Sequence, residues 1–494
     1  MKIAILTSTT AEELVKDLIK NDNKNKYDID IIALPVPVIS ILDTNVISKI
    51  IMKRTYLLNK LKDSNIIIIP GLVRGSTEVI EKATNVETYK GPKSLGVLPY
   101  ALDFIYNGGK LDKIKSADEV MGSVIPKITY KTAFKINDDI DIPMRGPPTI
   151  IIAEIHPDIR LEEVDEIAKR YVNDGAKILI IGSNQKTDPE IVKEKIKIAK
   201  KYAPVFVELS DISLIKSYQD LGIIGISTSS TFIQNNLDQI PMDLAIIIGD
   251  RNIKRLKKIG KDLINRGYKV IIDPVLGIPG IDFVNSIKRY INAIKSINAP
   301  ILFSAADVTE EIEADTLGIH GLLAMISIEL GASLYLVVEE TYKSIRGVSE
   351  AREAIRIAET AYSLKSSPRG IFSKLLVVKQ EDKPINIIDQ AKYEEVNYIP
   401  PSYNFNDYIQ INVDYNTKKI KVLFKRNNEI LAALQGKHAM SIARELVKRI
   451  NISADHAAYL GYELSKAEIA LKLGKTYVQD EPIIVPPWKG DNSD

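Results

Sequence analysis

Eight short apolar runs, each followed by a helical pattern, recur between residues 149 and 364, and this rhythm constrains the fold more than any other feature. Most runs are continuously apolar, which is typical of parallel strands covered on both faces. Eight β/α units in about 215 residues favour a closed (β/α)8 TIM barrel over an open sheet. The expected strands are Thr149–Glu154, Ala176–Ile181, Pro204–Leu209, Ile223–Ser227, Leu244–Ile248, Lys269–Asp273, Pro300–Ser304 and Ser333–Val338.

Two smaller domains are expected to flank this barrel, which we place at residues 149–366. Residues 1–140 predict a small open α/β domain of Rossmann-like type, including one helix near Val46–Leu61. The segment Asn137–Pro148, rich in Asp and Pro, is expected to be a linker. Residues 370–494 predict an α+β domain with an extended tail. Its expected elements are strand Lys374–Val378, a hairpin of Tyr408–Asp414 and Lys419–Lys425, and helices Met440–Arg449 and His456–Leu473.

Composition limits the chemistry of the chain. Its 494 residues include no cysteine, which excludes disulfides, thiolate nucleophiles and thiolate metal sites. The 66 basic and 64 acidic residues nearly balance, so we expect no nucleic-acid partner. The first residues predict a strand and an amphipathic helix rather than a signal peptide, and no run of about 18 apolar residues suggests a membrane span. We expect a cytoplasmic protein, and the abundance of Ile, Lys and Glu fits a thermophilic one.

Polar side chains follow the strands of the predicted barrel, at the end where TIM barrels carry their active sites. Glu154, Glu208 and Asp273 close strands one, three and six, and Asp307 follows strand seven. We expect these four carboxylates to converge on one ligand in a mouth with apolar walls. Further candidates at the same end are Asn184, Ser227, His156 and Asp250.

A carboxylate accepts two parallel N–H bonds from an amidine-like edge, so this acidic set suits a neutral or cationic heterocycle such as a 2-amino-4-oxo-pyrimidine. The same groups could hold a divalent cation, although we predict no metal site. Some polar residues after strands, Asp211 among them, are expected only to cap the next helix. His156 is the histidine we single out, because it follows a strand. His320 is expected on an outer helix face or at a cap.

Several strand ends resemble the pterin-binding superfamily, which contains dihydropteroate synthases and methyl-pterin-dependent, corrinoid-linked methyltransferases. The segment IIAEIHPDI is similar to the synthase opening Asn-x-Thr-Pro-Asp, with Glu154 and His156 at the Asn and Thr. GAKILIIGSN resembles the second strand of the family. PVFVELSD resembles the third, with Glu208 at the pterin-binding Asp, and GIIGIS the fourth, with Ser227 at the usual Asn. In VIIDPVLGI, Asp273 stands at the Asp that anchors the pyrimidine edge of the pterin.

Departures from the synthase pattern bear on the reaction. Dihydropteroate synthases carry Ser-x-Arg-Lys after strand seven and Arg-x-His-Asp after strand eight, where this chain has FSAADVTEE and VVEETYKS. A pyrophosphate leaving group would therefore lack its counter-charges at those positions. ADVTEEIEADTLGIHGLLA resembles the methyltransferase-like branch instead, with Asp307 at the Asn that reaches the pterin N5. The whole architecture resembles archaeal dihydropteroate-synthase-related proteins.

The resemblance implies a reduced pterin of the tetrahydromethanopterin or tetrahydrofolate type, with Asp307 as the catalytic residue of one-carbon (methyl) transfer. It also implies Asp273, Glu208, Ser227, Asn184 and Glu154 as pterin-binding residues. The acceptor is open, and a corrinoid is one candidate. Two alternatives remain: synthase-like C–N bond formation in pterin cofactor biosynthesis, and a non-catalytic pterin carrier or scaffold. We expect a homo-oligomer.

Overall fold

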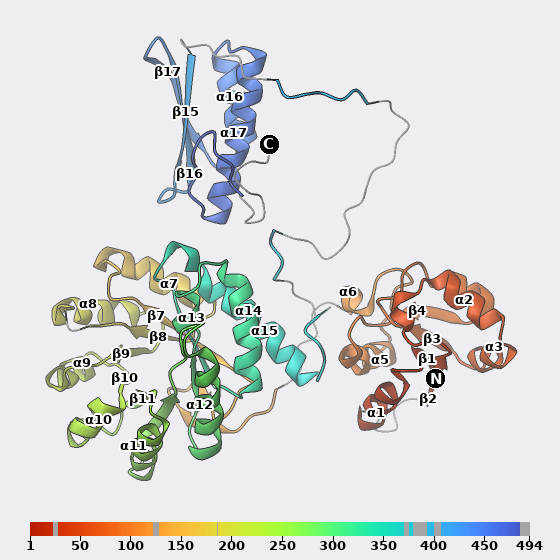
Figure 1. The fold of residues 1–494 in the computed structure, drawn as a ribbon, viewed down its shortest axis with the longest axis horizontal. Helices are drawn as coiled ribbons and strands as arrows, with labels where there is room; N and C mark the ends of the chain where they lie inside the picture. The colour runs from red at the N-terminus through yellow and green to blue at the C-terminus, as the bar shows by residue number, and fades with distance from the viewer. Residues whose placement is uncertain are drawn as a thin grey trace. The chain divides into compact units, whose positions relative to one another are not determined.

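The computed structural model describes residues 1–22, 28–121, 128–184, 186–369, 375–378, 393–399 and 407–484. The chain divides into two compact units, Met1–Glu381 and Asp382–Asp494. The first unit contains an N-terminal sheet and a barrel, and the second contains a sheet covered by two helices (Figure 1). Among the described residues, none of the helices combines the length and the apolar character of a membrane span.

The N-terminal sheet has four parallel strands in the order β2-β1-β3-β4. They are β1 (Lys2–Ser8), β2 (Asp28–Leu34), β3 (Ile66–Ile69) and β4 (Glu87–Lys90). Apolar side chains of α1 (Glu12–Asp22) and α5 (Leu98–Tyr106) cover one face. The other face packs against α2 (Thr44–Met52), α3 (Thr55–Lys62) and α4 (Glu78–Thr84), and a short α6 (Ala117–Met121) follows. The single helix predicted near Val46–Leu61 is wrong, because extended backbone at Arg54 separates α2 from α3.

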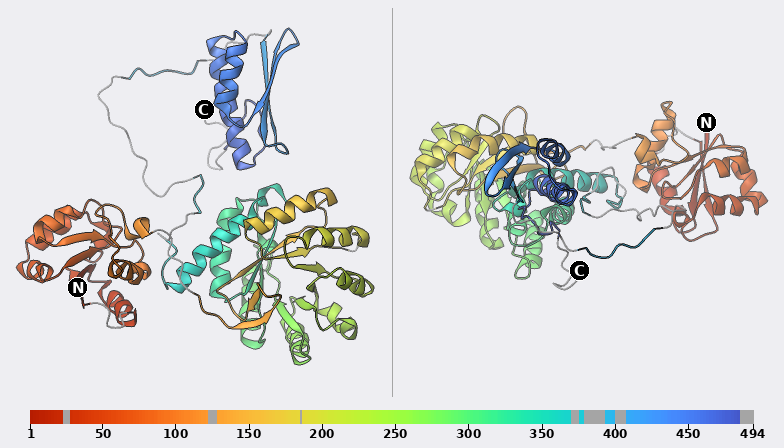
Figure 2. Two further views of the ribbon diagram at one scale, coloured as in Figure 1. Left: turned by 180° about the vertical axis from the view of Figure 1, so that it is seen from behind. Right: turned by 90° about the horizontal axis from the view of Figure 1, so that it is seen from above.

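Eight parallel strands form the barrel, which confirms the predicted fold class (Figures 1 and 2). They hydrogen-bond in the order β12-β11-β10-β9-β8-β7-β14-β13, and a bridge between Ile272 and Ile301 joins the two ends of this sheet. The predicted strand ends are correct to within two residues. The strands are β7 (Ile150–Ile155), β8 (Ile178–Ile181), β9 (Val205–Glu208), β10 (Gly225–Ser229), β11 (Ala245–Gly249), β12 (Lys269–Asp273), β13 (Leu302–Ser304) and β14 (Leu334–Val338).

Helices surround the sheet because each buries one apolar stripe against the outward side chains of the strands. Figure 2 shows this ring from behind. The helices are α7 (Val164–Asp174), α8 (Pro189–Ala199), α9 (Ile215–Asp220), α10 (Ser230–Asn236), α11 (Ile253–Asn265), α12 (Phe283–Ser296), α13 (Ala306–Thr309), α14 (Thr316–Glu329) and α15 (Gly347–Ser363). Asp211 accepts the Ser213 N–H at 2.9 Å, so its predicted capping role is confirmed.

The segment Asn137–Pro148, predicted as a linker, contributes to a β-hairpin. An antiparallel hairpin of β5 (Thr132–Lys135) and β6 (Asp141–Pro143) turns at Asn137, whose side chain accepts two backbone N–H groups. Ile142 is fully buried among the apolar side chains of the barrel interior. The hairpin therefore closes the amino-terminal end of the barrel.

The C-terminal unit has an antiparallel sheet of β15 (Asp407–Asp414), β16 (Lys419–Arg426) and β17 (Glu429–Gly436), and the predicted hairpin is confirmed. Helices α16 (Ala439–Arg449) and α17 (Ala454–Leu473) bury their apolar residues against one face of it. The sequence did not predict β17, which follows a tight turn with positive φ at Asn427 and Asn428. The strand predicted at Lys374–Val378 is wrong for residues 375–378, and Lys374 lies outside the described residues.

Candidate functional site

Side-chain alternation carries three of the four predicted carboxylates into the barrel mouth. Side chains two residues apart on a strand share a face. Ile152, Phe206 and Ile271 belong to the apolar interior cluster of the barrel. The residues two positions after them, at the carboxyl ends of the same strands, are Glu154, Glu208 and Asp273. Ser227 lies directly beside Glu208 in the register of β9 and β10.

Glu154 lies against β8, in space that Gly182 leaves free. A Cβ atom on Gly182 would lie 2.5 Å from Glu154 Oε1 and 2.8 Å from Pro157 Cδ. Burial, together with the negative charges of Glu208, Asp307 and Glu340, raises the pKa of Glu154 to about 7. Glu154 therefore lies close enough to these carboxylates to be influenced by their charge.

Glu208 is exposed to the mouth and is fixed by the loop after β8. The Ser183 N–H donates to Glu208 Oε2 at 3.1 Å, and the Ser183 hydroxyl donates to the Glu208 carbonyl at 2.7 Å. Partial desolvation raises the pKa of Glu208, against the opposing effects of the Ser183 N–H and of His156. His156 accepts the Asp158 N–H at 3.3 Å and lies 3.7 Å from a Glu340 oxygen.

Asp273 carries the most ordered carboxyl of the set. Its Oδ1 accepts the Val275 N–H at 2.8 Å and the Tyr290 hydroxyl at 3.2 Å. Within the described part of the chain, no donor bonds Oδ2, which would lie 3.8 Å from a Cβ atom built on Gly249 of the neighbouring strand β11. Burial, followed by the charge of Asp307, raises the pKa of Asp273 to about 7.

Asp307 stands on the first turn after β13, close to Asp273. Burial raises its pKa to about 6. Hydrogen bonds from the Ser304 side chain and the Leu276 backbone, and the charge of Arg251, oppose that rise. An acid with a pKa near 6 can both release and take up a proton at neutral pH, as general acid–base chemistry needs.

Two predicted site residues make local contacts that compete with ligand binding. The Asn184 amide oxygen accepts the Lys186 N–H and the Thr187 hydroxyl, at 2.9 and 3.0 Å. Both oxygens of Asp250 are bonded, with Arg255 Nε at 2.5 Å and Nη2 at 3.0 Å. These hydrogen bonds outweigh burial and lower the pKa of Asp250. These contacts indicate that Asp250 stabilises the connection between β11 and α11.

Sequence reasoning did not single out three polar groups near this mouth. Arg251 places a positive charge close enough to Asp307 to oppose the rise in its pKa, and it contributes to the lowered pKa of Asp282. Lys195 of α8 is fully buried, and its ammonium donates to the Pro157 carbonyl at 2.7 Å, which fixes the loop after β7. Tyr290 is also fully buried and belongs to an outer helix. Of these three, Arg251 had a signal in the sequence, since it lies two residues after the end of β11.

His320 is not on an outer face or at a cap, so that prediction is wrong. It is fully buried, its Nδ1 lies 3.0 Å from the Tyr335 hydroxyl, and its Nε2 has no partner within the described residues. Burial lowers the pKa of His320 to about 4, so the ring is neutral at physiological pH. The two residues lie between α14 and the outer face of β14, away from the mouth.

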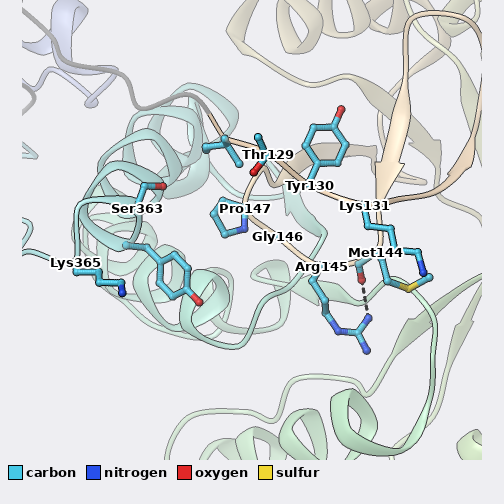
Figure 3. A pocket seen from close by; sticks show the side chains of 11 residues that line it. Thr129, Tyr130, Lys131, Met144, Arg145, Gly146, Pro147, Ser363 and Lys365 are labelled. Carbon is cyan, nitrogen blue, oxygen red and sulfur yellow. Dashed lines mark hydrogen bonds between the residues drawn. The ribbon is translucent and has the colours of Figure 1, made fainter. Parts of the chain in front are cut away.

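A pocket of about 610 Å³ lies at the opposite end of the barrel, and none of the predicted site residues lines it (Figure 3). Tyr130, Lys131, Tyr362 and Lys365 line it with the backbone around Pro147. The Arg145 guanidinium in its wall donates to the Met144 carbonyl at 2.6 Å (Figure 3). It also donates to the Ala299 carbonyl at 2.5 Å. In the described part of the chain, no group of three His, Asp or Glu side chains could hold a metal ion.

Comparison with known proteins finds similarity to a family model in the C-terminal unit, to one protein along nearly the whole chain, and to solved structures over about half of it. Residues 406–480 match the model of the PterinBD-DUF4346 family. An uncharacterised protein of Methanocaldococcus jannaschii is 28% identical, over 97% of this chain and 98% of its own. Dihydropteroate synthase from Yersinia pestis, solved with a pterine–sulfa conjugate, is 14% identical with a TM-score of 0.39, covering 48% of this chain and 100% of that chain. The Coxiella burnetii enzyme in complex with pteroic acid is 17% identical with a TM-score of 0.36, covering 44% and 93%. The predicted resemblance to pterin-binding proteins is confirmed by the family match over residues 406–480.

Proposed function

We propose that the barrel mouth binds a reduced pterin of the tetrahydromethanopterin or tetrahydrofolate type, and that the protein is an enzyme that transfers a methyl group to or from it. The observation that carries this proposal is the Asp273 carboxyl. Its Oδ1 is held by Val275 and Tyr290, while Oδ2 accepts no hydrogen bond from the described residues. A fixed carboxylate with one open oxygen is suited to the N–H edge of a 2-amino-4-oxo-pyrimidine.

Other polar side chains of the barrel mouth would add hydrogen bonds to the pterin. Glu208 supplies a second acceptor, fixed by Ser183, on the other side of the mouth. Ser227 sits beside Glu208 and can donate or accept a hydrogen bond to a ring heteroatom. Glu154, with a pKa near 7, can bind as a neutral donor or as a charged acceptor. His156 remains a candidate at the rim, beside Glu340.

Asp307 is the group we assign to the chemistry at N5. When a methyl group leaves N5 for a nucleophilic acceptor, the acceptor supplies the electron pair of the new bond and N5 keeps the pair of the broken bond. A proton delivered by the Asp307 carboxyl neutralises N5, and Asp307 is left as the carboxylate. Its pKa near 6 suits both states. A reduced corrinoid is one acceptor of the required nucleophilic character.

Calorimetry with 6-methyl-tetrahydropterin and its N5-methylated form tests the binding claim. We expect Asp273→Asn to weaken binding by about 100-fold, since charge-assisted hydrogen bonds contribute roughly 1.5–3 kcal/mol. The matched control is Asp243→Asn, an exposed aspartate before β11 at the opposite end of the barrel. If wild-type protein binds neither pterin, or if Asp273→Asn binds as well as the control, the proposal is wrong.

The second candidate function, synthase-like C–N bond formation, gains one observation from Arg251. This cation influences Asp307 from the loop after β11, a position different from the family's strand-seven and strand-eight cations. It could neutralise part of a pyrophosphate leaving group. Turnover of a dihydropterin pyrophosphate with an aminobenzoate, lost in Arg251→Ala, would favour this function over methyl transfer.

A non-catalytic pterin carrier is the third candidate. It would bind a reduced pterin tightly without turning over any methyl acceptor or aminobenzoate. The oligomeric state that we expect, a homo-oligomer, is measured by light scattering on the purified chain. Mass spectrometry of the molecule that co-purifies from the native host distinguishes the three functions most directly.

A further inference from the structure

We propose that Arg289 and Tyr290, neighbours on α12, are positioning residues that set the orientation of the two acids Asp273 and Asp307. This inference rests on the proposed function, because it assumes that these acids bind the pterin. It names residues outside the strand ends, on a helix whose sequence shows only an amphipathic pattern.

The turn after β12 presents two successive backbone N–H groups to the two acids. The Val275 N–H donates to Asp273 Oδ1 at 2.8 Å. The N–H of the next residue, Leu276, lies close enough to Asp307 to oppose the rise in the pKa of that carboxyl. One turn of backbone therefore orients both carboxyl groups, and a change in its conformation would displace both together.

Val275 holds that turn in an unfavourable conformation. Its φ is 57°, in the left-handed region that β-branched residues rarely adopt. Strained backbone of this kind persists only where surrounding contacts impose it, and it is concentrated at functional sites. The contacts that impose it here must therefore be identifiable.

Arg289 supplies those contacts. Its Nε donates to the Pro274 carbonyl at 3.3 Å, and its Nη2 donates to the Val275 carbonyl at 2.9 Å. Its Nη1 donates to Asp282 at 2.5 Å, which fixes the guanidinium itself. The planar guanidinium fork suits such a multiple contact, and a lysine ammonium does not.

These carbonyls belong to the same two peptide units that serve the acids. The Pro274 carbonyl shares its peptide with the Val275 N–H, and the Val275 carbonyl shares its peptide with the Leu276 N–H. Arg289 thus holds two peptides from one side, while on the other side the N–H of the first bonds Asp273 and the N–H of the second lies near Asp307. Hydrogen bonding to a peptide carbonyl also polarises its N–H and strengthens it as a donor.

Tyr290 completes the arrangement from the barrel wall. It is fully buried, and its hydroxyl donates to Asp273 Oδ1 at 3.2 Å. Asp273 Oδ1 therefore has two fixed donors, one from the turn and one from α12. Its second oxygen is left for a ligand.

Tyr290→Phe tests this inference against a closely matched control, Tyr335→Phe. Tyr335 is equally buried in the same barrel wall and also loses one hydrogen bond, to His320, but it does not contact Asp273. We expect Tyr290→Phe to weaken 6-methyl-tetrahydropterin binding about 10-fold, and the control to change it less than 2-fold. Equal effects of the two variants would overturn the role of Tyr290.

The pH profile of binding gives a readout that a merely structural role would not move. The groups around Asp273 that bear on its charge are Tyr290, Arg289 and Asp307. Removing the Tyr290 donor makes the carboxylate less favourable, so the acid-side midpoint of binding should move to higher pH in Tyr290→Phe and stay in place in Tyr335→Phe. An unmoved midpoint in Tyr290→Phe would contradict the inference, whatever the stability of the variant.

Arg289 is tested by rescue. Arg289→Lys keeps the charge but cannot hold two carbonyls, so it should bind pterin about 10-fold more weakly than wild type. Val275→Gly removes the strain and should restore part of the affinity in the Arg289→Lys background. Full affinity in Arg289→Lys, or no restoration by Val275→Gly, would overturn the role of Arg289. Loss of binding in Asp273→Asn with no effect at positions 289 and 290 would leave the proposed function standing and refute only this inference.

Discussion

Replacing Asp273 by Asn should make the barrel less sensitive to alkaline pH when no ligand is bound. Burial raises the pKa of Asp273 from 3.8 to about 7, so the folded state holds this proton more tightly than the unfolded chain. The stabilising effect is complete below pH 3.8 and is lost as pH rises toward 7. With a pKa of 3.8 in the unfolded chain and about 7 in the folded one, the free energy of unfolding falls by roughly 2.5 kcal/mol between pH 5 and pH 8. One pKa unit corresponds to about 1.36 kcal/mol. Asparagine does not titrate, so the variant escapes this loss.

Scanning calorimetry at pH 5 and pH 8 measures the effect. For a barrel of this size, 1 kcal/mol shifts the melting temperature by about 2–4 °C, so Asp273→Asn should gain roughly 5–10 °C over wild type on going from pH 5 to pH 8. Asp243→Asn, the exposed control, should follow the wild type. If wild type and Asp273→Asn show the same pH dependence, Asp273 is ionised in the free protein at neutral pH, and the burial argument is wrong.

Three further perturbations follow from contacts around the barrel. Gly182→Ala places a Cβ 2.5 Å from Glu154 Oε1, so calorimetry should show about 10-fold weaker pterin binding with an unchanged circular dichroism spectrum. His320→Gln should make the protein less sensitive to acid. Because burial lowers the pKa of His320 to about 4, the free energy of unfolding of the wild type should fall by about 3 kcal/mol between pH 6.5 and pH 4. Melting curves across that range test this prediction. Arg170→Ala leaves Glu339 buried without its partner at 2.6 Å and should lower the unfolding free energy by about 3–5 kcal/mol in denaturant titrations; adding Glu339→Gln should recover part of it.

The barrel could be predicted from the sequence because its signals are local. A parallel strand covered on both faces must be apolar along its length, and a helix must show its own period, so eight alternations of the two patterns leave few other folds. Asp273 was found for the same reason: it ends an apolar run, and β12 has the predicted bounds, Lys269–Asp273. Strand ends then pointed to Glu154, Glu208 and Asp307.

Groups that act on the site from other elements could not be predicted in this way. Tyr290 looks like any core residue of an amphipathic helix, and only the fold brings its hydroxyl to Asp273, 17 residues earlier in the chain. His320 failed for a related reason, because a histidine within an apolar helix gives no sign of which face is buried. The segment Asn137–Pro148 has the composition of a linker. The burial of its apolar residues Ile140 and Ile142 depends on the barrel interior against which they pack, which the sequence does not reveal.

The charge of the mouth also differs from what four acidic residues suggest. Glu154 and Asp273 have pKa values near 7 and Asp307 near 6, so at neutral pH these groups hold part of their protons. A neutral pterin therefore meets a weaker negative field than the sequence implies, together with carboxyl groups that can donate as well as accept. When N–H donors of the ligand bond Asp273, they stabilise its charged form, so its proton leaves as the ligand binds. Ionisation of Asp273 would therefore lower the stability of the free barrel and raise its affinity for the proposed pterin in the same pH range, since one carboxyl governs both.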